Sequence, residues 1–541
     1  MFVHNTVKKL TYFSIFLIFI LYSWDIGNVD AIRQGTEGFY LKVAKEMFES
    51  GNILVPQYVG ADHWSKPPLQ FWAAYLGYFI GGGPSIFISR LIVVLFTLFS
   101  LVITSRLISK SISKPFILVF VFIASTFGMF KYSRIFMMEV PLTMLTTLAS
   151  LYFYEYLKDK KHALILSSLF LGLSVLIKGP VSIVMSVGGC GLYLLFTWKR
   201  YGFNSKDLKK IFSWSVVGTA IASVWFIICF MKYGYIFFDY FFLRENLGKF
   251  STKSYPMRHV FQGLLIFSLP WSLYLPTSIS QIKDHLNKIK DDDYLVFCIC
   301  NFITFFFLWL IPSQRSHHYA MPSMIFFLVI NFILLNKYEL SQKRKKMMKL
   351  ANIAISIIMF LVATLLCSLL VFEDVQASYS LIIKVITTIC LLLFGSVLFL
   401  KSKKTLSQYF ISLFIIGNLW NILIPSFILP YLPKEVITKI GDRKVAAAVR
   451  KPYFIEEALG RKVEWLDGGK LEQYVIENNH YYIMHKSTFE TLKLQRLTKV
   501  VSSWRIWRRG IKANEVISAL KLKNINKLKD TVYLLENKPL K

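Results

Sequence analysis

Charged side chains gather in short segments between the long apolar runs of this 541-residue chain. The first such segment contains Glu37 and Tyr40, and Lys66 follows it in a Lys-Pro-Pro sequence. A carboxylate such as Glu37 can act as a general base, and a lysine such as Lys66 can supply a point charge for a phosphate. Because charges are costly to hold next to lipid, these segments predict a site that works on a charged, lipid-borne molecule.

Later segments contain groups of the same kind. Glu139 lies at the start of an apolar run, where a carboxylate normally has a partner, and Arg134 is close enough in sequence to be that partner. Lys178 lies in a Lys-Gly-Pro turn, and Arg315 begins a segment that continues to two histidines and a tyrosine. Paired histidines invite a metal interpretation, but adjacent residues do not face the same way on a helix.

Each of these groups has a structural alternative. Glu37 and Lys66 could be anchors at the membrane surface, and Glu139 could belong to an ion pair at the membrane edge. Lys178 could extend along apolar surface so that its charge reaches the interface. Taken singly, the charged positions therefore leave the choice between chemistry and anchoring open.

The composition predicts a membrane protein. Hydrophobic residues make up 55% of the chain, against roughly 45–50% in an average soluble domain. The apolar runs are about 20 residues long, the length that crosses a bilayer core, and they predict an α-helical polytopic protein with about thirteen spans. We interpret the first run as an uncleaved span, because no small-residue cleavage site follows it. The expected spans are 10–27, 87–108, 115–130, 139–157, 161–177, 180–198, 212–231, 258–277, 293–311, 319–336, 350–372, 380–400 and 405–427.

Basic loops predict the orientation of these spans. The loops at 158–161, 199–210, 343–346 and 401–404 all fall on one side if the amino terminus is cytoplasmic. The opposite side then receives a first outer loop, 28–86, and everything after residue 428. Apolar positions at helical spacing in 40–49, and the short apolar stretch 68–80, predict two interfacial helices in that loop.

The composition changes near residue 430. We expect a membrane domain over 1–430 and a soluble α/β domain over 431–541 on the outer, periplasmic side.

Lys and Arg outnumber Asp and Glu by 63 to 31. Much of this excess is the bias of membrane loops, but the second domain is basic too, which favours anionic lipid over nucleic acid, since no nucleic-acid motif accompanies the charge. The six cysteines lie in apolar runs, which favours neither a disulfide nor a zinc site. The expected strands lie in 463–466, 481–484, 500–507 and 531–535, and the expected helices in 434–450 and 471–478.

The order of the polar motifs is more specific than any one of them. An acidic-Gly-x-Tyr stretch begins at Glu37, and it is followed by Lys66-Pro-Pro, Arg134 ahead of Glu139, Lys178-Gly-Pro, Glu-Asn-x-x-Lys-Phe with Lys249, and Arg-x-x-x-Tyr-x-x-Pro from Arg315. This set resembles the GT-C superfamily of membrane glycosyltransferases, specifically the aminoarabinose (lipid A) transferase and protein mannosyltransferase family. The resemblance covers roughly residues 1–430 and is strongest over 30–75.

That resemblance implies transfer of a sugar, with inversion, from a polyprenyl phosphate to an acceptor outside the cytoplasm of a bacterium. It implies a multi-pass protein of the inner membrane, with Glu37 and Glu139 as the catalytic carboxylates. The donor phosphate would be bound by Lys66, Arg315, Tyr319, Lys178 and Lys249. The substrate site would be lined by Thr36, Tyr40, Arg134, His63 and His318.

The chain departs from the family pattern in ways that bear on its chemistry. Its first-loop motif lacks the usual leading Asp, so Glu37 is the carboxylate that is left, and Glu139 stands where Asp is usual. The aminoarabinose enzymes tend to have Glu before Lys-Pro-Pro and His after the Glu of the later motif, as a possible metal pair. Ser65 and Asn246 occupy those positions here, so the resemblance does not carry the metal over. A divalent metal stays an alternative, with Asp62 and His63 as the substitute ligands.

Several functions stay open at this point. A lipid A phosphate is an ionised acceptor that needs positioning, whereas a hydroxyl on a protein or glycan needs a base, for which Glu37 is the first candidate. A protein O-glycosyltransferase with the same donor is therefore one alternative. A transporter or flippase for a lipid-linked sugar is another, but transporters usually place binding groups near the bilayer midplane, often between internal repeats, and the sequence has neither. A scaffold in envelope assembly would not explain the ordered motifs.

Overall fold

The computed structural model describes residues 2–28, 35–248, 254–372, 379–402, 404–423, 432–449, 452–466, 471–508 and 511–538. The chain forms two compact units. The first comprises Met1–Gly27, Val43–Ile358 and Gly395–Gly417, and the second comprises Asn28–Lys42, Met359–Phe394 and Asn418–Lys541. The boundary predicted at residue 430 stays a prediction.

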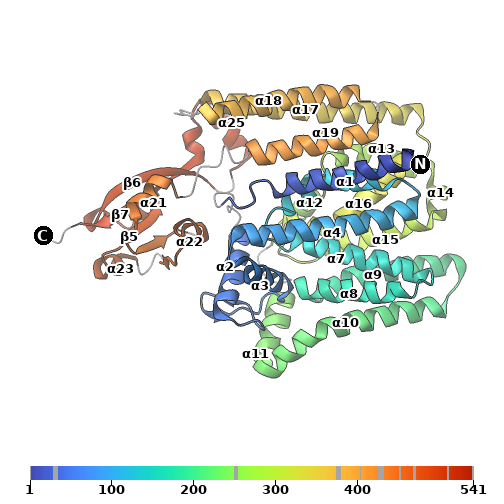
Figure 1. Cartoon of the computed structure of the whole chain (residues 1–541), viewed down its shortest axis with the longest axis horizontal. Coiled ribbons are helices and arrows are strands. Elements are labelled where there is room, and N and C mark those ends of the chain that lie inside the picture. The colour runs from blue at the N-terminus through green and yellow to red at the C-terminus, as the bar shows by residue number, and fades with distance from the viewer. Residues whose placement is uncertain are drawn as a thin grey trace. The chain divides into compact units, whose positions relative to one another are not determined.

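The first unit is a bundle of long helices that run side by side (Figure 1). Helix α7 lies inside the bundle, where it packs against α4, α8, α9 and α16, and nearly all of its residues are buried. The long helices are α1 (Phe2–Ser23), α4 (Ile86–Ile112), α7 (Glu139–Leu157), α8 (His162–Lys178), α9 (Val181–Tyr201), α10 (Ser205–Tyr233), α15 (Asp293–Leu308), α16 (Met321–Asn336) and α19 (Thr405–Asn418).

Shorter elements connect these helices. They are α5 (Phe116–Ala124), α6 (Phe127–Tyr132), α11 (Tyr235–Phe238), the π-helix η2 (Asp239–Leu247), α12 (Arg258–Phe267), η4 (Trp271–Tyr274), α13 (Leu275–Asp284), α14 (Leu286–Asp291) and η5 (His317–Ala320). Two further long helices, α17 (Gln342–Phe372) and α18 (Tyr379–Lys401), contribute residues to both units.

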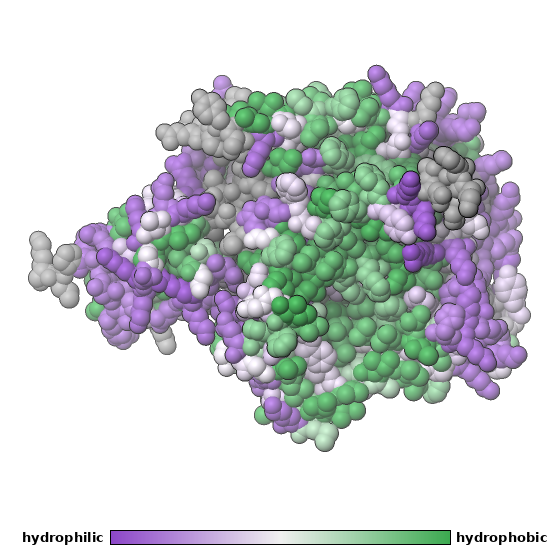
Figure 2. Space-filling view, viewed as in Figure 1, coloured by the Kyte–Doolittle hydropathy of each residue, from purple (hydrophilic) through white to green (hydrophobic). Residues whose placement is uncertain are grey.

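Apolar side chains cover most of the face of the bundle that Figure 2 shows. Leu95 and Phe99 of α4 are examples, with about half or more of each side chain exposed. Within the described residues, six helices are long and apolar enough to cross a membrane, or up to seven if the bent pair α12 and η4–α13 counts as one span. All thirteen expected spans contain a helix, but several are short, such as α8 and α15, so the count of thirteen stays a prediction.

Both surface helices predicted in the first loop are present as helices. They are α2 (Gly35–Ser50) and α3 (Leu69–Gly81), and the short hairpin of β1 (Gln57–Tyr58) and β2 (Ala61–Asp62) lies between them in sequence. Helix α3 ends where Gly82 adopts the left-handed conformation, which glycine enters without steric penalty. The location of the two helices at a membrane surface stays a prediction.

The second unit contains a five-stranded mixed sheet with the order β4-β3-β5-β7-β6. Strand β3 is parallel to β4 and β5, whereas β7 is antiparallel to β5 and β6. The strands are β3 (Val445–Ala448), β4 (Glu464–Trp465), β5 (Tyr481–His485), β6 (Thr498–Trp507) and β7 (Lys529–Asn537). The accompanying helices are α21 (Lys434–Ile440), α22 (Tyr453–Leu459), α23 (Leu471–Glu477), α24 (Lys486–Thr491) and α25 (Ala513–Lys521).

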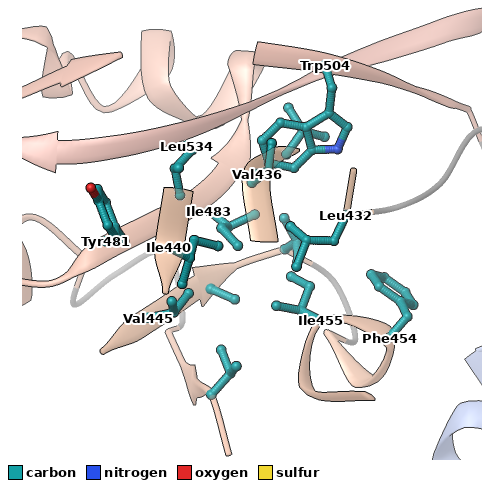
Figure 3. Close-up of a cluster of buried hydrophobic side chains, with 14 of the residues drawn as sticks. Leu432, Val436, Ile440, Val445, Phe454, Ile455, Tyr481, Ile483, Trp504 and Leu534 are labelled. Carbon is teal, nitrogen blue, oxygen red and sulfur yellow. The ribbon is translucent and has the colours of Figure 1, made fainter. Parts of the chain in front are cut away.

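Both faces of this sheet are buried, and successive side chains of β5 enter them in turn. Ile483 points into a cluster with Val436, Ile455 and Leu534 (Figure 3). Its neighbour Tyr482 lies in a separate cluster with Leu471, Val475 and Leu535. Helices therefore cover the two faces of the sheet.

The helix predicted over 434–450 is wrong beyond Ile440. Gly441, with a φ of +49°, ends α21, and the alanine-rich stretch that follows is strand β3. Alanine favours helix by intrinsic propensity. Here β3 is paired on both sides, by β4 and by β5, and the burial of Val445 and its neighbours outweighs that propensity.

Candidate functional site

Glu139 is the first residue of α7, and its side chain is 4% exposed. A carboxylate at a helix amino terminus is stabilised by the helix dipole. Oε1 of Glu139 lies 3.3 Å from Nε2 of His318. Oε2 is buried and has no hydrogen-bond partner in the described part of the chain. Because buried polar atoms are nearly always hydrogen-bonded, a water or a polar ligand group would complete the hydrogen bonding of this oxygen.

His318 is fixed on its other side as well. It lies in η5, and Nδ1 is 2.8 Å from Oγ of Ser316. A neutral imidazole satisfies both neighbours when Nε2 carries the proton, so that it faces the carboxylate while Nδ1 accepts from the Ser316 hydroxyl. His318 therefore orients Glu139 and is itself oriented by Ser316.

Two lysines lie near this carboxylate. Lys131, at the end of α6, has its Nζ 5.0 Å from the ring centre of Tyr132. Burial lowers the pKa of Lys131, and the Glu139 carboxylate opposes that shift. Lys178, the last residue of α8, has its Nζ 4.8 Å from the ring centres of both Trp309 and Tyr319.

The turn after Lys178 depends on glycine. Gly179 has a φ of +90°, which L-residues rarely adopt, and a Cβ added there would lie 3.1 Å from the ring of Phe241. The Oδ1 of Asn246 is also near that position, at 3.8 Å. The Lys-Gly-Pro turn is thereby packed against η2.

The π-helix η2 contributes a second charged group. Its Glu245 forms an ion pair with Lys66, whose Nζ also donates to the carbonyl of Ser65 at 2.8 Å. Oγ of Ser65 lies 2.5 Å from Nε2 of His63. Burial, and then the Lys66 charge, lower the pKa of His63 to about 4, while Glu245 acts in the opposite direction. π-Helical turns are rare and occur frequently at functional sites.

The structure thus brings together several of the predicted residues in the first unit. One set of contacts joins His63, Lys66 and Glu245. A second, continuous set joins Lys178, Tyr319, His318 and Glu139. Sequence reasoning did not assign Lys131, Trp309, Ser316 or Glu245 to the site. A tryptophan at the end of an apolar run was an available signal for Trp309, since tryptophan is enriched at membrane interfaces.

The predicted pairing of Arg134 with Glu139 is wrong. The Arg134 guanidinium donates to the carbonyls of Leu21, at 2.6 Å, and of Trp24, at the end of α1. Leu21 lies in the last turn of α1 and Trp24 follows the helix, and side-chain donors commonly satisfy carbonyls at a helix end. Burial lowers the pKa of Arg134 to about 9, with Asp25 among the groups that oppose the shift. The partner of Glu139 is His318.

Arg315 also binds backbone. It donates to the carbonyls of Leu310 and Tyr255, at 3.0 and 2.8 Å, so its predicted contact with a phosphate stays a prediction. Thr36, Glu37 and Tyr40 lie at the start of α2 in the second unit, where Glu37 and Tyr40 are buried. Lys249 lies outside the described residues.

The two positions at which related enzymes could hold a metal do not fit one here. Ser65 contacts His63, and the Asn246 side-chain amide donates to the carbonyl of Phe241 at 2.6 Å. A hydroxyl and an amide are also weak ligands beside the carboxylate and imidazole that they replace. Within the described residues, no group of three or more His, Cys, Asp or Glu side chains could hold a metal ion.

Residues 65–228 match the family described as dolichyl-phosphate-mannose-protein mannosyltransferase. An uncharacterized protein of Aquifex aeolicus is 28% identical over 65% of this chain and 68% of its own length. The undecaprenyl phosphate-alpha-4-amino-4-deoxy-L-arabinose arabinosyl transferase of Edwardsiella ictaluri is 23% identical, and the match covers 51% of each chain.

A solved structure extends the similarity to the fold of nearly the whole chain. ArnT from Cupriavidus metallidurans, bound to undecaprenyl phosphate, aligns with a TM-score of 0.69 over 97% of both chains at 14% identity. The chain is therefore similar in fold to ArnT and, over part of its length, to the mannosyltransferase family. The resemblance predicted from the loop motifs, to the aminoarabinose transferase and protein mannosyltransferase family, is confirmed.

Proposed function

We propose that this chain transfers a sugar from a polyprenyl-phosphate donor to an acceptor outside the cytoplasm, lipid A or a related envelope glycolipid. The similarity to transferases named for undecaprenyl phosphate, and to ArnT bound to that lipid, supports this donor class. The proposal places the protein in the bacterial inner membrane, with its amino terminus in the cytoplasm and residues 431–541 in the periplasm.

The donor phosphate binds, in this proposal, to the cations beside the Gly179 turn. Lys178 and Lys66 each present an ammonium group next to aromatic or polar side chains. As the bond between the anomeric carbon and the phosphate oxygen breaks, the electron pair leaves with the phosphate. Fixed cations stabilise that developing charge, which is commonly the largest electrostatic contribution to catalysis.

The acceptor attacks the anomeric carbon from the opposite face, which inverts its configuration. The observation on which this step depends is the buried Oε2 of Glu139, which has no hydrogen-bond partner among the described residues, while Oε1 contacts His318. Oε2 can take the proton of an acceptor hydroxyl. An acceptor phosphate that is already ionised needs no base and would be positioned by the cations instead. Glu37 stays a second predicted carboxylate for the same task.

The proposal is tested with purified full-length protein in liposomes. Undecaprenyl-phosphate sugars, including the 4-amino-4-deoxy-L-arabinose form, are supplied one at a time with lipid A, and released undecaprenyl phosphate is measured by mass spectrometry. We expect release that depends on both the donor and lipid A. Release with a peptide acceptor in place of lipid A would indicate a protein O-glycosyltransferase. Movement of the intact donor across the bilayer without release would indicate a flippase and overturn the proposal.

A further inference from the structure

The first half of α2 is packed closely on α22 of the second unit. A Cβ added to Gly38 would lie 2.7 Å from Cδ2 of Tyr453, closer than real Cβ atoms approach. The Tyr453 ring is itself supported by Trp465, with ring centres 5.2 Å apart in an edge-on arrangement. Only a residue without a side chain allows α2 to lie this close to α22, so Gly38 forms a notch for Tyr453.

Lys42 lies one helical turn after Gly38 and therefore on the same face of α2. Its Nζ is 2.8 Å from Oε2 of Glu456 and 5.0 Å from the Trp465 ring centre. The side chains of Lys42 and Glu456 are only 12% and 11% exposed. The ion pair is thus largely removed from water, where such a contact is screened much less than at the surface.

The Glu456 carboxylate is held by hydrogen bonds that do not involve Lys42. Its Oε1 accepts from the backbone N–H of Val463, at 3.3 Å, and from Nε1 of Trp465, at 3.1 Å. With Oε1 occupied in this way, Oε2 faces Lys42. The sheet-containing part of the second unit therefore offers a fixed acceptor for one particular lysine of the first loop.

A notch at position 38 and an ion pair at position 42 define one line along α2, and together they fix the rotation of the helix about its axis. Glu37 is adjacent to the notch and points about 100° away from it around the helix. We propose that Lys42 and Glu456 are positioning residues that hold Glu37 in its working direction, so that the carboxyl-terminal region acts in catalysis through α2. This inference rests on the proposed function, because Glu37 is one of its predicted carboxylates.

A buried ion pair is a poor way to gain stability alone, since apolar residues of similar volume often do as well or better. It is better suited to specifying one geometry. A purely structural contact would change the amount of folded protein, whereas a positioning contact changes the turnover of each folded molecule.

The experiment uses full-length protein in nanodiscs with the donor and acceptor that the wild-type protein uses. Lys42→Met and Glu456→Gln are compared with Lys42→Arg, which keeps the charge. Arg496→Gln is the matched control, because it breaks an exposed ion pair with Glu472 in the same unit. The readouts are hydrogen exchange of the amides of 35–42 and the separate kcat and KM of transfer.

We expect Lys42→Met and Glu456→Gln to raise exchange in 35–42 and to lower kcat at least tenfold, with the donor KM changed less than twofold. Lys42→Arg should restore most of kcat, and Arg496→Gln should change neither readout. Unchanged exchange, or unchanged kcat in the folded variants beside an active wild-type protein, overturns the positioning role alone. A wild-type protein that releases no undecaprenyl phosphate from any donor overturns the proposed function as well.

Discussion

His318 and Glu139 meet at 3.3 Å although they lie far apart in sequence, one in η5 and the other at the start of α7. The contact engages one carboxylate oxygen and leaves the other buried without a hydrogen-bond partner in the described residues. The histidine therefore fixes the direction of a carboxylate whose free oxygen is the reactive one in the proposed transfer.

The first prediction concerns that oxygen. Glu139→Gln keeps the shape of the side chain but removes its negative charge and basicity, and we expect the transfer rate to fall by about 10²- to 10⁴-fold. The thermal stability of the protein should not fall, because a buried charge is removed. The initial rate of undecaprenyl phosphate release and the unfolding temperature are measured together.

Glu155→Gln is the matched control for this substitution. Glu155 is also buried on α7, but it lies in the last turn and pairs with Lys160. Its loss should lower stability, since Lys160 is left without that carboxylate, and should leave the transfer rate within a few-fold of the wild-type rate. Equal rates for the Glu139 variant and the wild-type protein would remove Glu139 from the reaction.

Much of the helical fold could be predicted from the sequence, because apolar runs of sufficient length leave the backbone no alternative to helix in lipid. The strands with alternating or β-branched residues, such as β5 and β6, were predictable for a similar reason. Strand β3 was not, because its alanines favour helix until the neighbouring strands bury them.

The site was predictable as a set of residue types but not as a set of contacts. The partners of Arg134 are the backbone carbonyls of Leu21 and Trp24. Every residue has a backbone carbonyl, so the sequence gives no sign of which ones a side chain will bind. Glu139 could be matched with a nearby arginine by sequence distance, whereas its actual neighbour, His318, depends on how η5 packs in the folded chain.

The second prediction concerns donor binding. Lys178→Met keeps the apolar stem over Trp309 and Tyr319 but removes the ammonium group. Hydrogen bonds to charged groups contribute about 1.5–3 kcal/mol, so affinity for undecaprenyl phosphate should fall about 10- to 100-fold. Binding is measured by titration of undecaprenyl phosphate into protein in detergent. Lys158→Met removes another lysine from an aromatic ring, that of Tyr154, and should leave the affinity unchanged.

The third prediction concerns pH. The pKa of His63 is lowered to about 4, against about 6.5 in an unfolded chain, chiefly by burial and then by Lys66, with Glu245 opposing. Between these values the unfolded chain binds the proton and the folded protein does not, so stability is fully present above about pH 6.5 and is lost as the pH falls toward 4.

His63→Gln removes this titration and leaves a side chain that can still reach Ser65. We expect the unfolding temperature of the wild-type protein to fall between pH 7 and pH 5 by a few degrees more than that of the variant. If the unfolding temperatures of the two proteins changed equally with pH over this range, folding would not lower the pKa of His63.

The last prediction separates backbone strain from packing at the Lys-Gly-Pro turn. Gly179 and Gly202 end the successive helices α8 and α9 with nearly the same φ, +90° and +91°. A Cβ at Gly179 would meet the Phe241 ring at 3.1 Å, whereas a Cβ at Gly202 would meet nothing within 4 Å. Alanine at either position should lower the free energy of unfolding by about 1–3 kcal/mol through strain. Only Gly179→Ala should also displace Phe241 and η2, which contains the Glu245 partner of Lys66, and so raise the donor KM. If both variants changed the KM equally, the effect would come from strain in general, and the Gly179 turn would have no particular part in placing η2.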